Sequence, residues 1–211
     1  MSKYTVALEN ITKTFGRRLI FNNLNYLFSS SNIYGIAGQN GSGKSTLSKI
    51  IGGLITPTKG KVIHSENGNE IADVKLPNYL GFVSPYLTLY DEFTALENLE
   101  HFANIRGMKY DKERAKFLLN EFSLYDRRKD YLKGYSSGMK QRMKFIFALY
   151  HKPKLLLLDE PTSNLDVAGK DKVYEIIKNE GKENLVIIAS NEESDLALCG
   201  EVVRIENFKT L

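Results

Sequence analysis

The chain has 211 residues, of which 42% are hydrophobic and 26% charged, a composition typical of a globular protein with a substantial core. Disordered, collagen-like and coiled-coil classes are excluded. The net charge is only +4 and basic runs alternate with acids, so no nucleic-acid partner is predicted. A single cysteine, Cys199, excludes an intrachain disulfide and a cysteine-rich zinc site.

The first third of the chain is predicted to form strands. Residues 4–8 alternate, residues 19–28 are rich in Phe, Leu and Tyr, and residues 31–37 lead into a glycine cluster. Apolar runs such as residues 155–158 and 185–189 are far shorter than the roughly 20 residues that cross a bilayer. The N-terminus lacks the apolar core of a signal peptide, so we expect the chain to stay where it is made.

The apolar period becomes helical from Thr94, which forms a predicted capping box with Glu97. Gly107 is predicted to end this helix, and a second helix begins near Asp111. After Pro153 the pattern is a strand at 155–158, a helix at 167–180 closed by Gly181, and a strand at 185–189. Short apolar strands alternating with amphipathic helices predict a parallel sheet covered on both faces.

A phosphate-binding loop follows the predicted strand 33–37. It matches G-x-x-x-x-G-K-[ST], and a helix predicted at 46–51 comes next. The loop consists of Gly38, Gln39, Asn40, Gly41, Ser42, Gly43, Lys44, Ser45 and Thr46. Glycines let backbone N–H groups turn toward phosphate oxygens, and the helix directs its positive end at the same anion. Lys44 is expected to contact the β- and γ-phosphates, and Ser45 to place its hydroxyl on Mg²⁺.

The strand at 155–158 ends in two carboxylates, Asp159 and Glu160. Acids at the carboxyl end of a buried parallel strand stand where open α/β sheets bind ligands. Asp159 suits the magnesium shell, which takes hard oxygen donors. Glu160 suits the polarising of an attacking water. A turn or a helix cap is the structural alternative for such a pair.

The segment Tyr-Ser-Ser-Gly-Met-Lys-Gln-Arg, residues 135–142, opens a helix about 17 residues before the acidic strand. This helix is predicted to bury Met139, Met143, Ile146, Phe147 and Tyr150. With this spacing the chain resembles the ATP-binding subunit of an ATP-binding-cassette (ABC) transporter, over essentially its whole length. Residues 164–166, Asn-Leu-Asp, are similar to the D-loop of that family. Phe15 stands where the family has an aromatic residue stacked on adenine, and a core position is the alternative for it.

The resemblance implies an α/β fold, a P-loop NTPase with a mixed or parallel sheet core, an N-terminal antiparallel β region and an inserted helical subdomain. It implies a single domain, residues 1–211, with its core at about 1–85 and 151–211 and the helical subdomain at about 86–150. It also implies an ATPase that uses ATP and Mg²⁺, with Glu160 and Lys44 as catalytic residues and Ser45 and Asp159 holding the metal.

In the resembling family, two such domains enclose two ATP molecules head to tail. The resemblance therefore implies a homodimer or a heterodimer with a related subunit, in which nucleotide is contacted from the partner copy by Ser136, Ser137, Gly138 and Asp166. It also implies separate transmembrane subunits, and hence a peripheral position on the cytoplasmic face of a membrane. The signature resembles those of export-type systems.

Two positions depart from the family pattern. Pro85 stands where the family usually has Gln, and its side chain offers no hydrogen bond. Asn191 stands where the family usually has His; it can hydrogen-bond a γ-phosphate without carrying a proton, or Ser190 or Asn191 can cap a helix predicted at 192–198. These departures leave an ATP-gated regulatory module with weak hydrolysis as the alternative function.

Other classes are disfavoured by simple features. A DNA-repair or chromosome ATPase would need long coiled-coil arms, and only about 90 residues separate the phosphate loop from the signature. The guanine-reading motif Asn-Lys-x-Asp is absent, which favours ATP. The histidines His64, His101 and His151 have no metal-like spacing.

Overall fold

A computed structural model describes residues 3–209 and contains two sheets. The first is antiparallel, in the order β2-β1-β4-β5. Its strands are β1 (Tyr4–Phe15), β2 (Arg18–Ser29), β4 (Lys59–Glu66) and β5 (Asn69–Glu70). β1 runs well beyond the predicted 4–8, because register shifts between Leu8 and Thr14 let it keep pairing with β2 where the alternation is lost.

The second sheet is parallel throughout, as predicted, in the order β6-β7-β8-β3-β9. Its strands are β3 (Asn32–Ala37), β6 (Leu80–Val83), β7 (Leu155–Asp159), β8 (Leu185–Ser190) and β9 (Glu201–Arg204). Because neighbouring strands point the same way, all five carboxyl ends lie at one edge of the sheet. The phosphate loop and the two predicted carboxylates therefore lie along that edge.

The helices have local start signals that the sequence predicts. Thr94 and Glu97 form the capping box that opens α2, and the Asp111 side chain caps α3. The helices are α1 (Lys44–Ile51), α2 (Ala95–Ile105), α3 (Lys112–Glu121), α4 (Ser137–Tyr150), α5 (Val167–Glu180) and α6 (Glu193–Leu196), and short 3₁₀ turns are η1 (Asp73–Asn78), η2 (Tyr125–Arg127), η3 (Leu132–Gly134) and η4 (Ile205–Phe208). α1 begins two residues earlier than predicted, because the phosphate loop turns directly into it.

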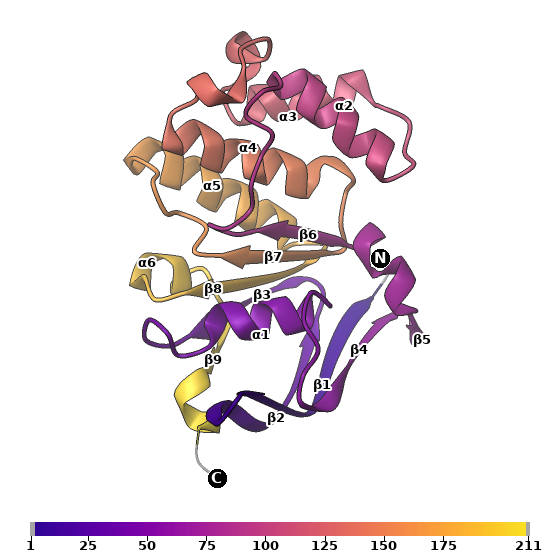
Figure 1. Cartoon of the computed structure of the whole chain (residues 1–211), viewed down its shortest axis with the longest axis vertical. Coiled ribbons are helices and arrows are strands. Elements are labelled where there is room, and N and C mark those ends of the chain that lie inside the picture. The colour runs from indigo at the N-terminus through magenta and orange to yellow at the C-terminus, as the bar shows by residue number, and fades with distance from the viewer. Residues whose placement is uncertain (1–2, 210–211) are drawn as a thin grey trace.

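The parallel sheet separates two hydrophobic cores (Figure 1). On one face, Leu156 and Leu158 pack in a core with α4, α5 and the more distant α2 and α3. On the other, Leu155 and Leu157 share a core with α1 and the antiparallel sheet. The alternation of one strand between two cores is what its continuous apolar sequence predicts.

α4 is buried over more of its circumference than the sequence predicts. Met143, Ile146 and Tyr150 are buried as expected, whereas Met139 and Phe147 are only half-buried. Four residues outside the predicted buried set are also buried, namely Gln141, Phe145, Ala148 and Leu149. The reason is its position between the parallel sheet and the outer helices, which a single amphipathic stripe does not reveal. None of the helices within residues 3–209 is both long and apolar enough to cross a membrane.

Candidate functional site

The phosphate loop joins β3 to α1 through a backbone turn that requires glycine. Gly43 is the N-cap of α1 and has φ of +118°, a region that residues with a side chain rarely adopt. A Cβ at Gly43 would also lie 2.4 Å from Cγ2 of Ile20 on β2. The turn thus presents the unpaired N–H groups of the first turn of α1 to the loop, where an anion binds most favourably.

Lys44 places its ammonium group across this loop although its side chain is almost fully buried. Its Nζ donates to the Gly38 carbonyl at 2.9 Å and lies 3.7 Å from Oε1 of Glu160. It also donates to the Gln39 carbonyl at 3.4 Å. A buried cation held by neutral carbonyls and a partly exposed carboxylate can transfer to a stronger anion. The position fits the predicted contact with phosphates.

Ser45 and Asp159 meet at the end of β7. The Ser45 hydroxyl donates to Oδ1 of Asp159 at 2.9 Å. The other carboxylate oxygen, Oδ2, is buried and has no hydrogen-bond partner among residues 3–209. Burial raises the pKa of Asp159 from its ordinary value, against the influence of Ser45 and nearby lysines. A buried oxygen without a partner beside a hydroxyl fits the donor set that Mg²⁺ prefers.

Glu160 follows in a strained backbone conformation. Its φ is +48°, unusual for a residue with a side chain, and its N–H donates to the Ala189 carbonyl at 2.9 Å. Burial raises the pKa of the Glu160 carboxyl, while Lys44 acts in the opposite direction. A carboxylate whose proton affinity is increased in this way is suited to accept a proton from water.

These groups surround a cavity of about 430 Å³. It is lined by Phe15, Arg18, Ile20, Asn40, Gly41, Gly43, Lys44, Ser45, Thr46, Pro85, Tyr86, Asp159 and Glu160. Phe15 is 52% exposed, so the alternative that it is a core residue is wrong. Its ring is accessible from the cavity, and Lys13 Nζ lies over it, 4.8 Å from the ring centroid.

Asn191 faces the phosphate loop. Its Nδ2 donates to Oδ1 of Asn40 at 3.3 Å. The N-cap of α6 is Glu192, and the Ser190 hydroxyl accepts from the Glu192 N–H at 3.1 Å. The alternative that Asn191 caps this helix is therefore wrong. The alternative that Ser190 caps it is supported by this hydrogen bond.

The signature and D-loop residues do not line this cavity within the part of the chain that the structure describes. Ser136 caps α4 by accepting from the Met139 N–H at 3.2 Å, and Asp166 caps α5 by accepting from the Gly169 N–H at 2.9 Å. The two segments touch each other instead, since a Cβ on Gly138 would lie 3.1 Å from the Asn164 carbonyl. Ser137 is the first residue of α4.

Two loop contacts escape the sequence analysis. Arg18 Nη2 donates to the Gly41 carbonyl at 3.1 Å, and the Gln39 N–H donates to Oε1 of Glu206 at 3.0 Å. The hydrogen bond from Gln39 also lowers the pKa of Glu206. Arg18 and Glu206 do not lie in a recognisable motif. They reach the phosphate loop only because of the order of strands in the two sheets.

Comparison with known proteins agrees with this geometry. The ABC transporter family model matches residues 21–163, which include the phosphate loop, the signature and the acidic strand. The chain belongs to the ABC transporter family.

Individual ABC relatives match nearly the whole chain. The lantibiotic transport ATP-binding protein SrtF of Streptococcus pyogenes is 33% identical over 203 residues, covering 96% of this chain and 84% of the relative. The lipoprotein-releasing system ATP-binding protein LolD of Treponema denticola is 33% identical over 207 residues, covering 91% of each. A solved ATP-binding subunit of an ABC transporter superposes with a TM-score of 0.82 at 24% identity, covering 94% of this chain and 85% of that one.

Family membership confirms the P-loop NTPase fold and the prediction that this ABC protein is an ATPase coupled to transport. ABC ATP-binding subunits work with transmembrane subunits, typically as dimers, and bind ATP, generally with Mg²⁺.

Proposed function

We propose that this chain is the ATP-hydrolysing subunit of an export-type transporter, and that two copies, or one copy and a related subunit, close head to tail on ATP. The observation that carries the proposal is the separation of the two halves of the site. The cavity holds the phosphate loop and the carboxylates, and the signature lies outside it. One chain therefore has an open site and, outside it, the start of α4. In a head-to-tail dimer, the start of α4 of each chain can meet the open site of the other.

The residues of one chain divide the chemistry among them. Lys44 binds the β- and γ-phosphate oxygens as it leaves Glu160, and α1 directs its first N–H groups at the same charge. Ser45 and Asp159 would hold Mg²⁺, which when bound neutralises phosphate charge. Glu160 accepts a proton from the attacking water. Phe15 covers the adenine, and Asn191 donates to the γ-phosphate in exchange for Asn40.

The second chain supplies Ser136, Ser137 and Gly138 at the start of α4, with Asp166 beside them. The N–H groups of this helix start and the Ser136 hydroxyl are suited to a phosphate with its growing charge. Because they arrive only when the dimer closes, hydrolysis is limited to the closed state. This is how ATP use would be tied to a movement.

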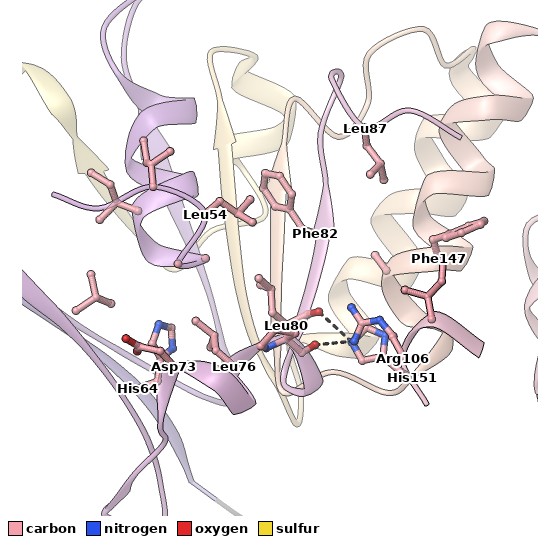
Figure 2. A pocket seen from close by; sticks show the side chains of 18 of the residues that line it. Leu54, His64, Asp73, Leu76, Leu80, Phe82, Leu87, Arg106, Phe147 and His151 are labelled. Carbon is pink, nitrogen blue, oxygen red and sulfur yellow. Dashed lines mark hydrogen bonds between the residues drawn. The ribbon is translucent and has the colours of Figure 1, made fainter. Parts of the chain in front are cut away.

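A second cavity offers a place for the transmembrane partner. It is a groove of about 670 Å³ between the core and the helices that follow β6, the predicted helical subdomain (Figure 2). Figure 2 shows Leu54 and Phe82 on one side of it and Phe147 on the other. Leu54 and Ile105 line it while 56% and 75% exposed, so large apolar side chains lie open to solvent here. We infer that an apolar segment of a separate transmembrane subunit docks here and holds the chain at the cytoplasmic face of the membrane.

Glu160→Gln tests the head-to-tail dimer. The amide keeps the shape of the carboxylate and cannot accept the proton, so ATP should persist between two chains. In MgATP, size-exclusion chromatography should then show a stable dimer of Glu160→Gln and only a transient one of the wild type. A Glu160→Gln protein that binds ATP and stays monomeric, even with its membrane partner, would contradict the proposal.

An ATP-gated regulatory module with weak hydrolysis is the second candidate, favoured by one observation. Pro85 lines the cavity next to Glu160 but contributes no polar side-chain group there. Undetectable turnover by the wild type together with its membrane partner would support this candidate and reject the first.

A further inference from the structure

One short segment connects the nucleotide cavity to the apolar groove. It follows β6 and runs from Ser84 to Asp91. Pro85 and Tyr86 line the cavity, whereas the next residues, Leu87 to Tyr90, line the groove. A partner docked in the groove thus touches the same segment that borders the nucleotide.

Two lysines of α4 hold this segment at its ends. Lys144 Nζ donates to the Ser84 carbonyl and to the Pro85 carbonyl, at 3.0 Å each. Lys140 Nζ donates to both oxygens of the Asp91 carboxylate, at 2.8 and 2.7 Å. Residues four apart lie on one face of a helix, so both contacts come from the same side of α4. The segment is therefore tied to the helix that begins with the signature.

Lys144 is committed to the segment by its surroundings. It is half-buried, and burial lowers the pKa of its ammonium group. Among residues 3–209 no carboxylate lies within ion-pair distance of it, so the two carbonyls are the groups that compensate its lost hydration. The Pro85 side chain has no hydrogen-bonding group, so it cannot anchor the segment itself.

We propose that Lys144 is a positioning residue for ATP hydrolysis, which with Lys140 fixes the Ser84–Asp91 segment to the signature helix. The segment, the cavity edge at Pro85 and Tyr86, and the start of α4 then move as one unit. Displacement of the segment in the groove would reach both the bound nucleotide of this chain and the signature that serves the other chain. This inference rests on the proposed nucleotide site.

Lys144→Met tests the tie, because methionine keeps the length of the side chain and removes the charge and donors. We expect kcat for ATP to fall about tenfold with KM within about twofold, because the phosphate loop and Phe15 are untouched. Lys144→Arg, which can still donate to both carbonyls, should keep most of the activity. Lys152→Met is the control, since Lys152 is an exposed lysine just after α4.

A second readout does not depend on turnover. The chain contains no tryptophan, so Tyr86→Trp places a single fluorescent reporter on the segment. In this background Lys144→Met should lower the fluorescence anisotropy of the reporter, and Lys152→Met should leave it unchanged. MgATP should change the emission of the parent Tyr86→Trp protein.

The outcomes separate this inference from the proposed function. If MgATP neither shifts the melting temperature of the wild type nor changes the emission of the Tyr86→Trp protein, the proposed nucleotide site fails. If ATP binds but Lys144→Met keeps wild-type kcat and anisotropy, the positioning role is overturned and the site stands. A loss of kcat that only matches a loss of folded protein overturns the role as well, since it shows a structural contribution alone.

Discussion

Lys44 and Glu160 form an ion pair across the cavity, and the proposed function gives its two members different roles, phosphate binding and proton acceptance. The ammonium and carboxylate lie 3.7 Å apart and are 6% and 26% exposed at their side chains. In the proposed function, phosphate oxygens would compete for the same cation, and binding would free Glu160 from the charge that opposes its raised pKa. On this proposal the pair would link phosphate binding to the ability of the Glu160 carboxylate to accept a proton.

Lys44→Ala should remove most of the stabilisation that MgATP gives to the fold. At a ligand concentration a hundredfold above Kd, the wild type should gain about 2.7 kcal/mol of unfolding free energy. Thermal melts with and without MgATP measure this gain. Lys112→Ala, an exposed substitution on α3, should retain the whole effect. Equal responses of wild type and Lys44→Ala would show that the phosphate-loop assignment is wrong.

Asn191 contacts the phosphate loop through Asn40, whereas its neighbour Ser190 is buried and also donates to Oε2 of Glu160 at 3.4 Å. Asn191→Ala should lower turnover by about 10- to 150-fold, the equivalent of a charge-assisted hydrogen bond of about 1.5–3 kcal/mol. Because Asn191 is exposed and is not the N-cap of α6, the unfolding free energy of the Asn191→Ala protein should differ from that of the wild type by less than about 0.5 kcal/mol.

Ser190→Ala should instead cost stability, because its buried hydroxyl accepts from Glu192 and donates to Asp195. Asn191→His should change turnover by restoring an imidazole at this position. ATPase rates and melting temperatures of the three variants show whether each residue contributes to turnover or to stability. If Asn191→Ala and Asn191→His turn over ATP as the wild type does, Asn191 has no role at the γ-phosphate.

At the scale of elements, the packing of β6 against α4 depends on a missing side chain. A Cβ on Gly81 would lie 2.4 Å from the Ala148 carbonyl and 2.9 Å from Cγ of Pro153. Backbone atoms of a buried helix cannot give way easily. This close contact is what brings Lys144 within reach of the residues that end β6.

Gly81→Ala should therefore destabilise the fold by about 1–3 kcal/mol through overpacking between β6 and α4. Urea denaturation should show a lower midpoint with an unchanged slope. Gly134→Ala is the matched control, since a Cβ at Gly134 meets nothing within 4 Å. A midpoint for Gly81→Ala equal to that of the control would show that the two elements are not in such close contact.

The same scale shows what a sequence can predict. The beginnings of α2 and α3 depend on residues three apart, and the sequence predicts them correctly at Thr94 and Asp111. The burial of Phe145 and the contacts of Arg18 and Glu206 depend on which strands become neighbours, and no local pattern encodes that order. The phosphate-loop residues were identifiable because the motif is contiguous. The link through Lys144 was not, since its partners are about 60 residues earlier in the chain.

At the scale of the whole molecule, a buried histidine joins the antiparallel sheet to the layer behind it. His64 on β4 is 4% exposed; its Nδ1 is bonded to the Tyr4 hydroxyl at 2.8 Å and its Nε2 to the Ile51 carbonyl at the end of α1 at 2.9 Å. Burial lowers the pKa of His64 from 6.5 to about 4. The folded state therefore holds the neutral ring, while the unfolded chain takes up a proton below about pH 6.5.

The contribution of neutral His64 to the unfolding free energy should accordingly be fully present above about pH 6.5. It should be lost as the pH falls toward 4, a decrease of about 3 kcal/mol. Urea denaturation at several pH values between 7 and 4 measures how steeply the unfolding free energy falls with pH. His64→Gln should be less stable at pH 7 and have a flatter slope. Adding His151→Gln should flatten it further, because burial also lowers the pKa of His151 to about 4. A slope that neither substitution alters would assign the acid sensitivity to the carboxylates.

The strand order also has a consequence for how the protein is made. β3, which carries the phosphate loop, is flanked in the sheet by β8 and β9, whose residues are 185–190 and 201–204. On a ribosome, β3 emerges long before either neighbour has been translated. A nascent chain thus lacks both strands that flank its phosphate-loop turn until residues 185–204 have been translated, and a fragment cut short before β8 lacks these neighbours altogether. We therefore expect competence to bind ATP only after β8 and β9 have been translated.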